Sequence, residues 1–225
     1  MAPRVARRYG VRPRRLVNCA AILATLLCVA FPGRASADPP IRLLAFGDSL
    51  TAGYGLAPAD VFPVKLQARL KADGYDAVVL NGGFSGDTTA GGLSRIKWSL
   101  QDRPQYAIVE LGANDALRGM SPVVAEANLD KILARFRDAH VKVLLAGMRA
   151  PANWGALYQY RFDAIYPRLA QKYGVPLYPF FLDGVALDPT LNQGDGLHPN
   201  ARGVDVIVAR IGPAVERLLP HPTGR

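Results

Sequence analysis

The chain has few cysteines and few histidines, and both shortages restrict its chemistry. It contains two cysteines, Cys19 and Cys28, both close to the N-terminus. If that end is removed during export, the rest of the chain can form no disulfide, no thiolate nucleophile and no zinc–thiolate site. A chain without free thiols also suits an oxidising compartment. The histidines are His140, His198 and His221, so a histidine base has few candidates.

The first 37 residues contain no acidic residue and have the pattern of an export signal. Six arginines within the first 15 residues precede an apolar run from Leu16 to Phe31, and Ala35-Ser36-Ala37 follows. This order predicts a signal peptide cleaved after Ala37, and hence a periplasmic or secreted protein without a stable membrane anchor. An uncleaved anchor is the alternative, although the run is shorter than the ~20 residues that span a membrane. Paired arginines leave twin-arginine export open beside the Sec route.

The positive charge of the chain belongs to the same segment. Seven of the 27 Lys and Arg residues lie in it and none of the 18 acids do, so the formal net charge of +9 falls to +2 (20 minus 18) after cleavage. A nearly balanced charge gives no support to nucleic-acid binding. Residues 38–220, followed by a short tail at 221–225, suffice for one domain with a sizeable core.

Short apolar runs of β type alternate with helical stripes along this domain. Strands are predicted at 41–46, 77–80, 106–111, 141–146 and 175–178. Apolar residues at helical spacing form four stripes: Phe62, Leu66 and Leu70; Leu129, Ile132, Leu133 and Phe136; Phe162, Ile165, Tyr166 and Leu169; and Val204, Ile207, Val208, Ile211, Val215 and Leu218. Strands that are apolar throughout are typical of parallel sheets covered on both faces. The sequence therefore predicts a three-layer α/β/α sandwich with a five-stranded parallel sheet, doubly wound and flavodoxin-like.

Polar loops, three of them rich in glycine, lie next to these elements. Segments 47–50, 81–87 and 112–115 end the first three predicted strands, and segment 194–199 precedes the last helix. Ligands of open α/β sheets bind at the carboxyl ends of the strands, where helix N-termini present free N–H groups. We therefore expect the chemistry in these loops. Glu110, inside the third predicted strand, needs a polar partner that the sequence does not name.

A serine, a histidine and an aspartate in these loops are the parts of a serine hydrolase. The serine needs an adjacent base, and the base needs a group that fixes its tautomer. His198 alone has a closely spaced acid, Asp195, in a loop framed by Gly and Pro. Ser49 is the candidate nucleophile and Ser85 a rival; neither lies in a G-x-S-x-G elbow, so an α/β-hydrolase fold is not indicated. Structural roles are the alternatives, with Ser49 as a helix N-cap and Asp195 bonded to backbone.

Taken together, the four loops resemble the motif blocks of the SGNH, or GDSL, hydrolase family over about residues 43–200. Within that family the chain is most similar to small bacterial periplasmic thioesterases, lysophospholipases and arylesterases. The resemblance implies that Ser49 is the nucleophile, His198 the base and Asp195 its orienting acid. It also implies an oxyanion hole made by the N–H groups of Ser49 and Gly86 and by the side-chain amide of Asn114.

The resemblance further implies the kind of substrate. Ala113 stands where this subgroup usually has glycine, which bears on substrate fit. Apolar residues expected near an acyl chain are Leu117, Met148, Trp154 and Phe180, with Met120, Tyr158 and Phe181 as further candidates. We expect a monomer without metal or cofactor that hydrolyses short- to medium-chain acyl esters and thioesters, lysophospholipids included. A carbohydrate acetylesterase of the same family is the alternative enzyme, and a non-catalytic lipid- or glycan-binding protein the alternative of another class.

Overall fold

One parallel sheet organises the part of the chain that the computed structural model describes, which is residue 10 and residues 39–222. Apart from residue 10, the expected signal peptide lies outside the described residues. The strand order is β2-β1-β3-β4-β5, and every pairing is parallel. The strands are β1 (Ile41–Gly47), β2 (Ala77–Gly83), β3 (Tyr106–Glu110), β4 (Lys142–Ala146) and β5 (Leu177–Tyr178). This is the flavodoxin-like order, so the predicted fold is confirmed.

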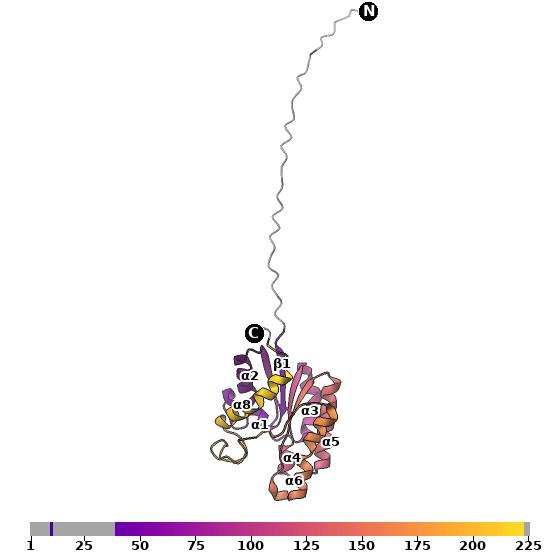
Figure 1. Ribbon diagram of the computed structural model, residues 1–225, viewed down its shortest axis with the longest axis vertical. Coiled ribbons are helices and arrows are strands. Elements are labelled where there is room, and N and C mark those ends of the chain that lie inside the picture. The colour runs from indigo at the N-terminus through magenta and orange to yellow at the C-terminus, as the bar shows by residue number, and fades with distance from the viewer. Residues whose placement is uncertain (1–9, 11–38, 223–225) are drawn as a thin grey trace, which may run out of the picture. The chain divides into compact units, whose positions relative to one another are not determined.

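Helices cover both faces of the sheet (Figure 1). On one side α2 (Phe62–Ala72) packs against α8 (Ala201–Leu218), and on the other α3 (Thr89–Ser99) packs against α5 (Pro122–Asp138). The central strands are buried along most of their length, as the continuous apolar runs require. The shorter helices are α1 (Ser49–Ala52), α4 (Ala113–Leu117), α6 (Ala156–Asp163), α7 (Ile165–Tyr173) and the 3-10 turns η1 (Pro58–Asp60), η2 (Leu100–Asp102) and η3 (Ala152–Trp154).

The predicted helical stripe at residues 162–169 is divided between two helices. α6 ends at Asp163 and α7 begins at Ile165, with Ala164 between them. Pro167 accounts for the break, because it has no N–H to bond the Asp163 carbonyl and its ring crowds that oxygen. The four apolar residues of the stripe are nevertheless all buried. The spacing therefore predicts the buried face correctly but not the break in the backbone.

The chain changes direction across the sheet between β1 and β3. From β1 it runs outward to β2, and it then returns to β3 on the opposite side. Loops that leave neighbouring strands at such a switch point diverge and leave a crevice at the carboxyl ends. Gly47 and Glu110, which end these two strands, are partners in the sheet. None of the helices in residues 39–222 is long and apolar enough to cross a membrane.

Candidate active site

The turn between β1 and α1 presents Ser49 at the switch point. The Asp48 carboxylate accepts the N–H of Leu50 at 3.0 Å and caps α1. Asp48 is therefore the N-cap, and the Ser49 hydroxyl is left for another partner. Among the described residues no hydrogen bond uses the backbone N–H of Ser49, as expected for the first residue of a helix.

His198 and Asp195 complete a chain of hydrogen bonds that starts at Ser49. The Ser49 Oγ lies 3.0 Å from His198 Nε2, and His198 Nδ1 lies 2.6 Å from Asp195 Oδ2. The other carboxylate oxygen accepts the N–H groups of His198 and Leu197, at 3.0 and 2.9 Å. These two bonds, His198 first, lower the pKa of Asp195 to about 2. An ionised carboxylate only accepts, so Nδ1 carries the proton and Nε2 can take one from Ser49.

Two residues whose roles the sequence did not indicate hold this histidine in place. Gln193 donates its backbone N–H to the His198 carbonyl at 2.7 Å, and its side chain donates to the carbonyls of Tyr54 and Pro199 at 2.8 and 2.9 Å. The Tyr54 ring lies against the imidazole, with 4.7 Å between centroids. These contacts join the histidine loop, which carries Asp195 and His198, to the segment after α1. The contacts with Tyr54 depend on a segment distant in the chain, so no local pattern predicts them.

Donors suited to an oxyanion come from the loops after β2 and β3. Gly86 has a positive φ of 85°, and no hydrogen bond within residues 39–222 uses its N–H. Asn114, in α4, donates its side-chain amide to the Asp87 carbonyl at 2.9 Å and to Asp48 Oδ2 at 3.3 Å. Both acceptors belong to other segments, so the Asn114 side chain makes no hydrogen bond within its own turn. Ala113 lies in α4 with an ordinary negative φ, so its methyl group introduces no backbone strain.

Two buried carboxyl groups, those of Asp48 and Glu110, lie at the turn that carries Ser49. Glu110 Oε2 accepts the Thr51 hydroxyl at 2.8 Å and the Asp48 N–H at 3.4 Å, while its Oε1 has no partner among the described residues. Burial and the nearby Asp48 carboxyl raise the pKa of Glu110 well above its ordinary value. Burial likewise raises the pKa of Asp48 to about 7. Thr51 is thus the partner that the sequence left unnamed.

The residues expected to contact an acyl chain fall into three groups by exposure. Leu117 and Trp154 are exposed by 44% and 45%, and the Trp154 ring packs against the backbone at Gly119, close after α4. Met148 and Phe181 belong to the core, at 3% and 0% exposed, so they present no surface to a ligand. The remaining three, Met120, Tyr158 and Phe180, are partly buried. The Tyr158 hydroxyl bonds the Met120 carbonyl at 2.8 Å, and the Arg149 guanidinium lies over the Phe180 ring.

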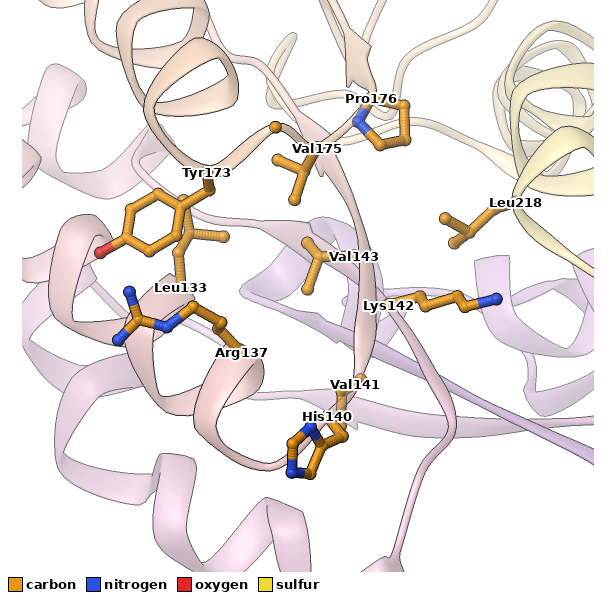
Figure 2. A pocket seen from close by; sticks show the side chains of 11 residues that line it. Leu133, Arg137, His140, Val141, Lys142, Val143, Tyr173, Val175, Pro176 and Leu218 are labelled. Carbon is orange, nitrogen blue, oxygen red and sulfur yellow. The ribbon is translucent and has the colours of Figure 1, made fainter.

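The rival residues take no part in the hydrogen bonds that join Ser49, His198 and Asp195. Ser85 is exposed, and its hydroxyl bonds no other described residue. His140 borders a separate hollow of about 430 Å³ at the amino ends of β4 and β5, the opposite edge of the sheet (Figure 2). Around that hollow the polar ends of Arg137, His140 and Lys142 point in different directions (Figure 2). They therefore do not converge on one ligand position.

The fold and the Ser–His–Asp hydrogen bonds are those of a serine hydrolase. The chain belongs to the GDSL-like lipase/acylhydrolase family, whose model matches residues 45–206. It is 40% identical to an arylesterase of Vibrio mimicus, over 79% of this chain and 87% of the relative. It is 39% identical to the Escherichia coli thioesterase 1/protease 1/lysophospholipase L1, over 80% and 85%. The crystal structure of AlinE4, an SGNH-hydrolase family esterase, is 51% identical with a TM-score of 0.68, covering 81% of this chain and 98% of that one.

Proposed function

We propose that the protein hydrolyses short- to medium-chain acyl esters and thioesters, lysophospholipids included, through an acyl-Ser49 intermediate. The observation that carries this proposal is the continuous path from Ser49 Oγ through the His198 ring to Asp195, with contacts of 3.0 and 2.6 Å. The relatives named arylesterase and thioesterase/lysophospholipase support the substrate class.

In the acylation step, Ser49 Oγ attacks the carbonyl carbon while His198 Nε2 accepts the hydroxyl proton. The ionised Asp195 stabilises the imidazolium that forms and keeps the ring in the required orientation. Collapse of the tetrahedral intermediate expels the alcohol or thiol, which takes the proton from Nε2. In the second step Nε2 accepts a proton from water while the water oxygen attacks the acyl-Ser49 carbonyl. Collapse of this second tetrahedral intermediate breaks the bond to Ser49 Oγ, which takes the proton back from Nε2 as the carboxylic acid leaves.

Negative charge on the carbonyl oxygen would be met by the N–H groups of Ser49 and Gly86 and by the Asn114 amide. Neither backbone N–H donates to another acceptor among the described residues, so no existing hydrogen bond is lost when the two groups bind the oxygen. The Asn114 amide makes a longer contact with Asp48, at 3.3 Å, than with the Asp87 carbonyl, at 2.9 Å. The Asn114 amide would give up its longer hydrogen bond, the one to Asp48, when it donates to the oxyanion. Such donors act on charge that appears only as the intermediate forms.

For the acyl chain, we propose the exposed apolar side chains of Leu117 and Trp154, with the partly buried Phe180 as a further candidate. We also propose that the protein is a monomer, exported with cleavage after Ala37, and active in the periplasm or outside the cell. The arginine-rich start, the apolar run and the Ala-Ser-Ala site support the export and the cleavage.

The decisive test combines covalent labelling with kinetics. An organophosphonate should modify the peptide that contains Ser49, and Ser49→Ala should lower kcat about 10⁶-fold while the protein stays folded. Labelling of Ser85 would overturn the assignment of the nucleophile. Rates on p-nitrophenyl esters of increasing chain length, an acyl-thioester, lysophosphatidylcholine and acetylated xylan address the substrate. Turnover of acetylated xylan alone would favour the carbohydrate acetylesterase instead.

A further inference from the structure

Arg95, on α3, is a largely buried arginine whose guanidinium joins three segments of the active-site edge. Its Nη2 donates to the Gly47 carbonyl at 2.7 Å and its Nη1 to the Gly82 carbonyl at 2.8 Å. Its Nε pairs with the Asp87 carboxylate at 2.5 Å. The guanidinium carbon also lies over the Phe46 ring, 4.2 Å from the centroid. One side chain therefore ties the ends of β1 and β2 to the loop that follows β2.

Asp87 extends this link to two of the proposed oxyanion donors. It directly follows Gly86, and its carbonyl oxygen accepts the Asn114 amide at 2.9 Å. Its carboxylate occupies the space beside Gly91, where an added Cβ would lie 2.5 Å from Oδ1. A residue larger than glycine at position 91 would therefore displace the carboxylate. The position of Asp87 thus determines where the Gly86 N–H and the Asn114 amide lie.

Gly47 extends the same link to the third donor. It lies two residues before Ser49, and its carbonyl oxygen accepts the Phe84 N–H at 3.1 Å in addition to the Arg95 guanidinium. We propose that the Asp87–Arg95 ion pair fixes the spacing of the three donors that bind the oxyanion. Arg95 and Asp87 are then positioning residues, and this role rests on the proposed acyl-serine mechanism.

A positioning role should change kcat and KM by different amounts, which a purely structural role does not require. The donors matter most when charge develops on the carbonyl oxygen, so their misplacement lowers kcat more than it raises KM. A displacement of about 1 Å can cost about 10²-fold in rate. The Ser49–His198 contact does not involve the ion pair, so the pH dependence of kcat/KM should keep its shape.

Arg95→Lys tests this, because lysine keeps the charge but cannot donate to three separate acceptors from one planar group. Arg69→Lys is the matched control. Arg69 lies on α2, pairs with Glu216 at 2.9 Å and donates to the Ala209 carbonyl at 3.1 Å, away from the active-site loops. We expect Arg95→Lys to lower kcat on p-nitrophenyl butyrate by about 10²-fold, with KM changed less than about threefold. Arg69→Lys should leave both constants unchanged.

A double-mutant cycle with Asn114→Ala shows whether Arg95 acts through the donors. Asn114→Ala alone should lower kcat by about 10²–10³-fold. If the ion pair positions that amide, the double variant should lose clearly less than the product of the two single losses. Fully multiplicative losses, or an unchanged kcat in folded Arg95→Lys, would overturn the proposal. If Arg95→Lys does not fold, Asp87→Asn undergoes the same cycle, with the same two outcomes. Absence of hydrolysis and of Ser49 labelling in the wild-type protein would instead refute the proposed function.

Discussion

Replacement of Glu110 by glutamine should flatten the pH dependence of folding stability. Burial and the nearby Asp48 carboxyl raise the pKa of Glu110 well above its ordinary value, so the folded protein should hold this proton to a higher pH than the unfolded chain does. The unfolded chain releases the proton at about pH 4.3. Above that pH the folded state binds more protons than the unfolded state, so the free energy of unfolding falls as the pH rises through the window up to the folded-state pKa.

The expected slope follows from the number of protons involved. Because the folded state binds one more proton, the free energy of unfolding falls by about 1.4 kcal/mol for each pH unit in that window. A typical domain is stable by only about 5–15 kcal/mol, so this loss is measurable. Glutamine has nearly the same shape, keeps an oxygen for the Thr51 hydroxyl and carries no charge at any pH. Asp48, whose pKa is raised to about 7 by burial, leaves the variant with a residual slope of the same sign.

Urea denaturation followed by far-UV circular dichroism, at half-unit steps from pH 5 to pH 8, provides the measurement. The curve of unfolding free energy against pH should fall more steeply for the wild-type protein than for Glu110→Gln. Glu126→Gln is a suitable control, because Glu126 forms an exposed pair with Arg168 and its removal should leave the wild-type slope. Parallel curves for the wild-type protein and Glu110→Gln would show that Glu110 is ionised in the folded state, against our reasoning.

Two further predictions concern the histidine loop and export. Asp195→Asn removes the carboxylate that holds the Nδ1 proton of His198 and should cost up to about 10⁴-fold in kcat, measured with p-nitrophenyl butyrate; His140→Ala, the control, should keep the wild-type rate, and a fast Asp195→Asn enzyme would exclude the triad. N-terminal sequencing of the exported protein should begin at Asp38, whereas a sequence that starts at Met1 would show that the leader is retained.

The fold could be predicted because its strands and helices carry strong periodic patterns. Some ends of these elements, however, depend on the neighbouring segments with which they pair. β2 continues through Asn81-Gly82-Gly83, a segment that resembles a loop in composition. These residues pair in register with Ala45 to Gly47, and that pairing supplies the hydrogen bonds their composition does not suggest. The break before α7 had a local signal in Pro167, which apolar spacing alone does not reveal.

The residues that would perform chemistry could be located from sequence, whereas those that hold them could not. Ser49, His198 and Asp195 belong to compact motifs whose residue types are rare together. Arg95 and Gln193, by contrast, act through backbone carbonyls, among them those of the distant Gly47 and Tyr54. An arginine or glutamine on its own has many surface roles. For a related reason, the sequence did not separate core residues from surface residues among those expected to contact an acyl chain. Met148 and Phe181 look like groove residues by type, but the same apolar character fills the core.

The carboxyl groups around Ser49 show how one site can keep different charges on its two sides. Asp195 is partly exposed and accepts two backbone N–H groups, and these bonds favour its ionised form, with the pKa lowered to about 2. Glu110 is fully buried, which favours its neutral form. A negative charge is therefore favoured beside His198, where an imidazolium would form, and disfavoured beneath the turn whose Ser49 N–H would meet the oxyanion. Like charges repel strongly where water is excluded, so a charged Glu110 would oppose the oxyanion that this donor would stabilise.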